Sequence, residues 1–312
     1  MRGANRLAAG KNQGGDCVPS HHSFVGSILD ETRLELGEGP VYDPDLDCLW
    51  WFDILGRSLR RHDLATGTAS AHSLPFLGSV IARIDGNRHL IASDQGLFLR
   101  DLASGELSRH CELEPESRGN RSNDGRMHPC GALWIGTMGK TAATGGGAIY
   151  HVAGKTVTTL FDKVSIPNSI CFSPDGATGY FVDSKVNTLM RVPLDPATGL
   201  PIGAASVLVD GRDQPGVFDG SVCDAKGDIW NARWGGGGVD RYDAQGRHLA
   251  RYDMPAERVT CPAFFGRQAD RLMVTSCWEG LDADARAADP LAGATFELGV
   301  AVEGRIEPAF KL

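Results

Sequence analysis

The fold of this chain is decided by four segments that share one pattern, LGEGP (36–40), RSNDG (121–125), IPNSI (166–170) and FDGSV (218–222). Each segment opens a stretch in which a polar residue leads into a short strand, a tight turn and further hydrophobic strands. Two weaker copies begin near Val80 and Thr260. Successive copies lie about 40 to 50 residues apart, a period typical of a β-propeller blade with four short strands. The sequence therefore predicts an all-β fold, a six-bladed β-propeller with a central, metal-containing channel.

The repeat spans most of the 312 residues, so we expect one closed propeller domain over residues 23–312 rather than two domains. Residues 1–22 are polar and glycine-rich and lack the apolar core of a secretory signal, so we expect a flexible tail there. The segment Ile28–Leu34 is expected to add a strand to blade six and close the ring. The last residues of the chain, about 20 in number, are expected to supply the late strands of the same blade.

Charge and composition exclude several classes of partner. The net charge of −8 argues against binding to nucleic acid or to an anionic membrane surface, because both require a basic face. No apolar run approaches the length of about 18 residues that spans a membrane. The eight cysteines are scattered and form no C-x-x-C pair, which favours a reduced protein inside the cell, with the cytoplasm as its compartment.

Glu38, Asn168 and Asp219 occupy similar positions in their repeats, and all three offer oxygen atoms. A propeller brings equivalent positions of its blades to one axis, so these side chains should meet. Two carboxylates and an amide oxygen suit one hard divalent cation, and Ca²⁺, Mg²⁺, Mn²⁺, Zn²⁺ and Fe²⁺ all tolerate such ligands. The alternative is that each residue merely caps a strand or turn, as Asp and Asn often do.

Five motifs, taken in order, resemble the SMP-30/gluconolactonase/regucalcin family of six-bladed propellers, and the resemblance covers nearly everything from Leu34 to Leu312. The motifs are LGEGP, RSNDG followed by GALWIGTM, IPNSICFSPDG with YFVDS, FDGSVCDAKGDIW, and NARWGGGGVDRYD. The resemblance implies a metal-dependent sugar-acid lactonase whose partner is a small-molecule sugar lactone. It leaves the particular lactone, the metal and the oligomeric state open.

The resemblance also assigns residues. Glu38, Asn168 and Asp219 match the metal ligands of the family. Arg121 and Asn123 match its substrate-contacting Arg-x-Asn, and Asp124 matches the neighbouring acid. The chain departs from the family pattern in two places: Phe218 stands where a proline often precedes the aspartate, and Gly139-Lys140 stand where some members carry a sugar-contacting glutamate.

The expected chemistry is hydrolysis of a lactone by an activated water. A divalent cation polarises the lactone carbonyl or acidifies a water, and Asp219 takes the proton as general base. Arg121 and Asn123 are expected to hold substrate oxygens, although a solvated surface position is the commoner fate of an arginine. Two rival hypotheses remain: a phosphotriesterase- or arylesterase-like hydrolase on the same scaffold, and a calcium-binding protein without catalysis.

Overall fold

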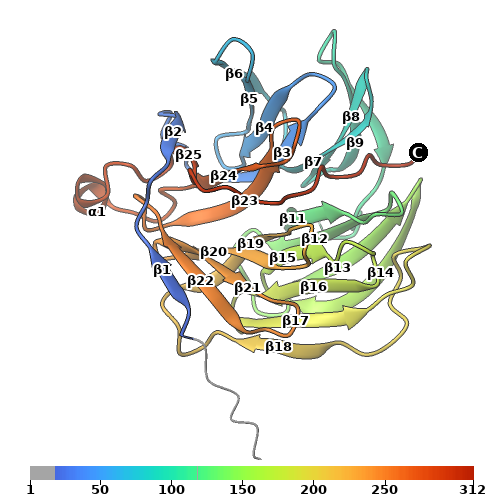
Figure 1. Cartoon of the computed structure of the whole chain (residues 1–312). Coiled ribbons are helices and arrows are strands. Elements are labelled where there is room, and N and C mark those ends of the chain that lie inside the picture. The colour runs from blue at the N-terminus through green and yellow to red at the C-terminus, as the bar shows by residue number, and fades with distance from the viewer. Residues whose placement is uncertain (1–17, 118) are drawn as a thin grey trace, which may run out of the picture.

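The computed structural model describes residues 18–117 and 119–312 of the chain. These residues form six sheets arranged around a central axis, so the predicted six-bladed β-propeller is confirmed (Figure 1). We number the blades in chain order. The single helix in the described part of the chain is α1 (Ala283–Ala288), in the connection between two strands of blade six.

The first three blades each have four strands in sequence order. Blade one contains β3 (Gly37–Asp43), β4 (Cys48–Asp53), β5 (Ser58–Asp63) and β6 (Thr68–Ser73). Blade two contains β7 (Gly78–Asp85), β8 (Arg88–Ser93), β9 (Gly96–Asp101) and β10 (Leu107–Cys111). Blade three contains β11 (Asn120–Met127), β12 (Leu133–Gly139), β13 (Gly147–Ala153) and β14 (Thr156–Val164).

The last three blades complete the ring, and the two final ones also take strands from the N-terminal part of the chain. Blade four contains β15 (Pro167–Phe172), β16 (Thr178–Asp183), β17 (Thr188–Pro193) and β18 (Ser206–Asp210). Blade five contains β19 (Val217–Cys223), β20 (Ile229–Trp234), β21 (Gly238–Tyr242), β22 (His248–Asp253) and β1 (Ser20–His22). Blade six contains β23 (Val259–Phe265), β24 (Arg271–Ser276), β25 (Thr295–Glu297) and β2 (Ser27–Asp30).

The ring is closed by a strand from the beginning of the propeller. β2 pairs antiparallel with β25, and Ile28 lies opposite Phe296. This confirms the expectation that the segment near Ile28 completes blade six. Closure joins the two ends of the domain, so that the described ring has no gap in which another chain could add a strand. The first strands of successive blades contact one another all the way round, from β3 to β23 and back to β3.

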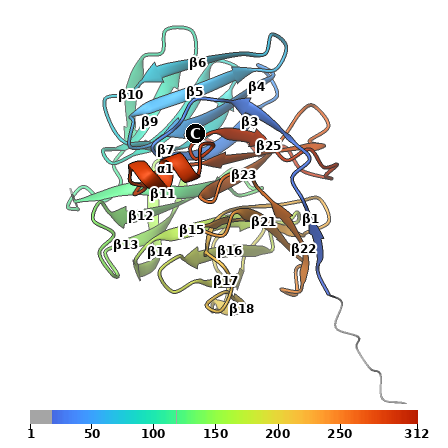
Figure 2. The same cartoon turned by 90° about the vertical axis from the view of Figure 1, so that its left-hand side faces the viewer.

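Two terminal segments differ from the prediction. Residues 20–22, assigned above to a flexible tail, form β1, which pairs in parallel with β22 (Figure 2). The ring of His22 stacks on Tyr252, and His21 Nε2 lies 2.7 Å from Asp253 Oδ1, so side-chain contacts add to the backbone pairing. That part of the tail prediction is wrong, and residues 1–17 lie outside the described residues.

The C-terminal segment supplies only β25 to blade six, so the prediction of several late strands there was too generous. After β25 the chain crosses one end of the ring without further strands (Figure 1). The backbone N–H of Phe310 donates to the Arg83 carbonyl at 2.7 Å. On the axis, Arg126 Nη1 lies 3.1 Å from Glu307 Oε2. Since this segment covers the end where the first strands of the blades finish, the opposite end remains for a ligand.

The core lies between neighbouring blades and is rich in aromatic side chains. Trp51, Trp134 and Trp230, which lie on the second strands of blades one, three and five, are fully buried. The seven cysteines in the described residues are free thiols, and Cys17 lies outside those residues. Among the described residues, no helix has the length and apolar character needed to cross a membrane.

Candidate functional site

A cavity of about 250 Å³ opens at the end of the ring where the first strands of the blades begin. Its polar walls are formed by Glu38, Arg121, Asn123, Asn168, Ser184, Asp219 and Glu279. Its apolar walls are formed by Leu36, Met138, Ala142, Ile166, Val217 and Trp234. Four blades thus bring the three candidate metal ligands together with the Arg–Asn pair, as the sequence predicted.

A β-bulge in the first strand of blades one, four and five sets the direction of the three candidate ligands. Glu38 and Asn168 are the last paired residues before the bulges of β3 and β15, whereas Asp219 comes one residue later, inside the bulge of β19. The repeat positions are therefore similar but not identical. The residues that follow the first two, Gly39 and Ser169, have left-handed backbones with φ of 57° and 56°. Glycine is required at position 39, because a Cβ there would lie 2.1 Å from the Ser79 carbonyl oxygen of blade two.

A chain of hydrogen bonds fixes the amide of Asn168. Arg121 Nη1 donates to Asn123 Oδ1 at 2.7 Å, and Asn123 Nδ2 donates to Asn168 Oδ1 at 2.9 Å. Asn168 Nδ2 donates to Ser184 Oγ at 3.0 Å, and this hydroxyl donates to the Phe218 carbonyl at 2.8 Å. The amide nitrogen is thus committed to Ser184. The amide oxygen accepts one bond from Asn123 and keeps a second lone pair for a ligand.

The electrostatics of the cavity favour a bound cation. Burial, together with the charge of Asp124, raises the pKa of Glu38 to about 8. Burial and the charge of Glu38 raise the pKa of Asp219 well above its usual range, while Arg121 opposes this rise. Two buried carboxylates that disfavour each other's ionised form are stabilised when a cation lies between them.

The donor set fits a hard divalent cation. No group of three His, Cys, Asp or Glu side chains within residues 18–117 and 119–312 is arranged to hold a metal ion. The set formed by Glu38, Asn168 and Asp219 contains only two such residues and depends on the amide oxygen for its third ligand. Oxygen-only ligands of this kind match Ca²⁺, Mg²⁺ or Mn²⁺ better than the thiolate and imidazole ligands of a closed zinc site.

The structure places Asp124 behind the cavity and not in its wall. Its Oδ2 accepts a hydrogen bond from the backbone N–H of Ile170 at 2.7 Å, which ties blade three to blade four. Burial raises the pKa of Asp124 to about 6, although Arg126 opposes the rise. This placement does not support the predicted contact between Asp124 and a substrate. Asp124 instead adds negative charge beneath Glu38 and Asp219.

The structure also shows where Arg121, Asp183 and Lys140 lie relative to the cavity. Arg121 is buried and lines the cavity, so the solvated surface position does not apply to it. Asp183 accepts hydrogen bonds from the backbone N–H groups of Ser165 and Ile166 at 2.7 and 3.1 Å, which is a turn-stabilising role. Lys140 lies outside the cavity wall, and its Nζ pairs with Asp94 Oδ2 at 2.8 Å.

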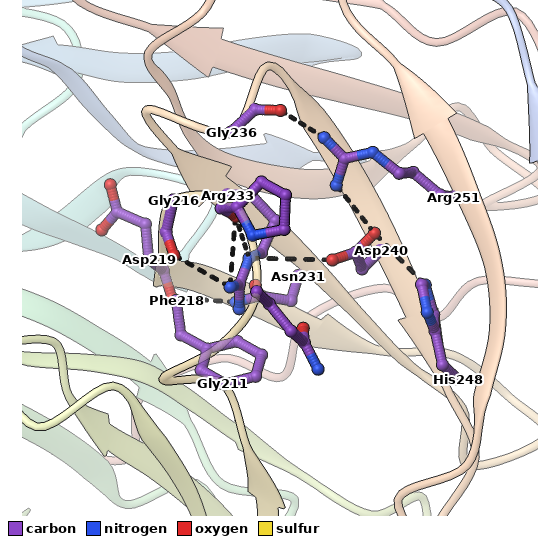
Figure 3. A network of polar contacts seen from close by, with 12 residues as sticks. Gly211, Gly216, Phe218, Asp219, Asn231, Arg233, Gly236, Asp240, His248 and Arg251 are labelled. Carbon is purple, nitrogen blue, oxygen red and sulfur yellow. Dashed lines mark hydrogen bonds and ion pairs between the residues drawn. The ribbon is translucent and has the colours of Figure 1, made fainter.

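Arg233 explains the unusual phenylalanine before Asp219. Its fully buried guanidinium donates to two backbone carbonyls of the loop 215–216 and lies 4.1 Å from the centroid of the Phe218 ring (Figure 3). Asp240 Oδ2 lies 3.7 Å from Arg233 Nε and partly balances its charge. The Asp219 carboxylate points away from this network. The cation and ring together support the backbone that carries Asp219.

Sequence reasoning missed two polar residues of the cavity wall. Ser184 directly follows the YFVD strand, and Glu279 follows Ser-Cys-Trp just after β24. Both lie just beyond the end of a second strand, on the same side of the ring as the bulges of the first strands. The signal that could have found them was this position at a strand end, but Ser and Glu are common there for reasons unrelated to binding.

Comparison with known proteins places this chain in a family. Residues 36–278 match the family model described as SMP-30/Gluconolactonase/LRE-like region. The chain is 37% identical to a pentonolactonase of Haloferax volcanii, covering 91% of this chain and 97% of the relative. It is 34% identical to a 6-deoxy-6-sulfogluconolactonase of Pseudomonas putida, covering 88% and 94%.

A solved structure agrees with the fold throughout. The crystal structure of a calcium-binding protein, regucalcin, from Agrobacterium tumefaciens superposes with a TM-score of 0.93 at 60% sequence identity, covering 95% of this chain and all of that chain. The match of the family model, the identity to these relatives and the shared propeller agree over nearly the whole chain. The protein therefore belongs to the SMP-30/gluconolactonase/LRE-like family.

Proposed function

We propose that this protein is a metal-dependent lactonase that opens a sugar lactone to the corresponding sugar acid. The observation that carries the proposal is the cavity itself, in which two buried carboxylates and an amide oxygen lie beside a buried Arg–Asn pair. Relatives that are named for lactone substrates, a pentonolactone and a sulfonated gluconolactone, support the same reaction class.

Glu38, Asn168 and Asp219 would hold one divalent cation at the floor of the cavity. When bound, such a cation supplies Lewis-acid polarisation of a carbonyl and lowers the pKa of a nearby water. The hydrogen bonds from Asn123 and to Ser184 orient the Asn168 amide for this task. Outer partners of this type commonly tune both metal affinity and activity.

Substrate binding, proton transfer and exclusion of water are assigned to side chains of the protein. Arg121 presents guanidinium N–H groups to substrate oxygens, with its own orientation held by Asn123 Oδ1 and by the Ser122 carbonyl at 2.9 Å. Asp219 accepts the proton of the attacking water. The apolar side chains of Met138 and Trp234 narrow the cavity and limit competing water.

The proposed function is tested by acid release from a panel of sugar lactones, using chelated protein to which single metals are added back. We expect hydrolysis above the spontaneous rate with at least one metal, and loss of activity on chelation. Faster turnover of a phosphotriester or aryl ester than of every sugar lactone would favour the hydrolase rival. Metal binding without any lactone hydrolysis would favour the calcium-binding rival, the property named for the Agrobacterium relative.

Replacing Arg121 with alanine should lower kcat/KM without releasing the metal. The loss of a hydrogen bond to a charged group is worth about 1.5–3 kcal/mol, or roughly ten- to a hundredfold. Kinetics on the best lactone and metal titration by calorimetry check the two halves of this prediction. An unchanged kcat/KM would show that Arg121 does not contact the substrate.

Replacing Ser184 with alanine should weaken metal binding by about tenfold, since the Asn168 amide loses the acceptor that orients it. The variant also leaves the Phe218 carbonyl without its hydroxyl donor, so thermal unfolding must be measured in parallel. Ser173→Ala, on an exposed turn of the same blade, is the matched control. Equal metal affinity in the Ser184 variant and wild type would contradict the orienting role.

A further inference from the structure

Glu279 is a wall residue of the cavity that the proposed chemistry does not use. It lies three residues beyond β24 and is half-buried, across the cavity from the blade-three side that carries Arg121. Its charge interacts with those of both Arg121 and Asp219. Among the described residues, however, no ion pair within 4.0 Å joins Glu279 to any cation. Glu279 and Arg121 therefore face one space without pairing directly.

The backbone of Glu279 is held firmly at both of its polar groups. Its N–H donates to the Glu35 carbonyl at 2.9 Å, and its carbonyl accepts from Arg258 Nη1. The Arg258 guanidinium also lies 5.6 Å from the ring centroid of Trp234, another wall residue. The carboxylate thus extends from a fixed point of the wall, which is what a preorganised binding group requires.

The carboxylate of Glu279 accepts no hydrogen bond from any residue in the described part of the chain. The acids at the ends of the second strands in three other blades behave differently. They bind the backbone N–H groups that lead into the first strand of their own blade, in the pairs Asp53–Leu36, Asp94–Leu77 and Asp183–Ile166 at 3.0, 3.0 and 3.1 Å. In blade six the corresponding strand end carries Ser276, and Glu279, three residues further along the chain, lines the cavity.

The net charge of the cavity depends on which ion and which substrate are bound in it. Glu38, Asp219 and Glu279 carry three negative charges when ionised, and Arg121 carries one positive charge. A divalent cation brings this sum to zero. A substrate with its own negative group then places an uncompensated charge next to Glu279, whereas the hydroxyl groups of a neutral substrate can donate to its two oxygens.

We propose that Glu279 is a specificity-determining residue that accepts hydrogen bonds from a pair of hydroxyls and selects neutral polyhydroxylated lactones over lactones with an anionic substituent. The inference rests on the proposed lactonase function and narrows its substrate class. The relatives do not decide the point, because their names include both a neutral pentonolactone and a sulfonated gluconolactone.

The test compares Glu279→Gln and Glu279→Ala with wild type on three metal-loaded reactions. The first substrate is a neutral pentonolactone. The second is δ-valerolactone, which has no hydroxyls. The third is an aldarolactone with a free carboxylate. Glu279→Ala should lower kcat/KM on the pentonolactone by about 10- to 100-fold and change δ-valerolactone turnover by less than about threefold. Glu279→Gln should raise the ratio of aldarolactone to pentonolactone kcat/KM at least about tenfold.

Glu35→Gln is the matched control, since it removes the same charge from a neighbouring residue that does not line the cavity. It should leave the substrate ratio unchanged. Equal losses on hydroxylated and unhydroxylated lactones, or an unchanged substrate ratio in Glu279→Gln, would overturn the proposal. So would a loss of metal affinity above about 100-fold, the size expected for a direct ligand, which would make Glu279 a metal ligand. Failure of the wild type to hydrolyse any lactone would instead be failure of the proposed function itself.

Discussion

Asp219→Asn is expected to reduce kcat by about 10²–10⁴, the usual effect of losing a general base. This corresponds to roughly 3–5 kcal/mol of additional barrier. Asparagine keeps an oxygen of nearly the same reach, so part of the metal affinity should remain, but an amide cannot accept a proton at neutral pH. The variant thereby separates the two roles assigned to Asp219, ligand and base.

The measurement is kcat at saturating metal, corrected for spontaneous opening of the lactone. If Asp219 is only a ligand, excess metal should restore the rate. Recovery to within about threefold of wild type, less than about 1 kcal/mol of barrier, would remove the base assignment. Asp124→Asn is the companion variant, because Asp124 is an equally buried acid that lies outside the cavity wall. It should lose far less activity than Asp219→Asn, and the reverse order would make Asp124 the base.

Glu38→Gln is expected to weaken metal binding by at least about 100-fold while the propeller stays folded. Even residues that only orient metal ligands commonly contribute about ten- to a hundredfold in affinity, and here a charged ligand becomes neutral. Glutamine can still accept the hydrogen bond that Glu38 Oε2 takes from the N–H of Gly39 at 2.8 Å. Calorimetric titration and thermal unfolding check the two parts, and equal affinity in variant and wild type would remove Glu38 from the site.

Metal binding should also depend on pH in a direction set by Glu38. Burial and the charge of Asp124 raise the pKa of Glu38 to about 8, so the metal-free protein at pH 7 carries a proton that the cation must displace. Affinity should therefore rise with pH between about 6 and 9, with proton release on binding. This dependence should be weaker in Glu38→Gln, since glutamine does not titrate.

The blade repeat was predictable from the sequence because it depends on local patterns of residue type. Polar residues, tight turns and hydrophobic strands recur at a constant spacing, and the two weak copies near Val80 and Thr260 indeed open β7 and β23. The same spacing is enough to predict that Glu38, Asn168 and Asp219 lie near one another at the axis. Strand formation and turn chemistry depend on neighbouring residues, so a single sequence contains enough information for both.

Other features were decided by contacts between distant parts of the chain. The one-residue offset of Asp219 is absorbed by a bulge, and the strand pairing that defines a bulge is not visible in composition. β1 forms because the edge of β22 has unpaired backbone groups, which a polar segment such as Ser20–His22 can satisfy without hydrophobic side chains. The path of the C-terminal segment depends on Arg126, a buried cation on the axis that is paired by Glu307.

The sequence by itself thus determined the architecture of the ring and the oxygen donors at its axis, because period and residue type are local properties of the chain. Only the tertiary structure decided that Asp124 lies behind the cavity and that Glu279 lies in its wall. Asp124 lies within β11, whereas Glu279 lies three residues beyond β24, and neither sequence context shows which acid faces the cavity. Register, bulges and closure of the ring determine which carboxylate faces the cavity and which one joins two blades.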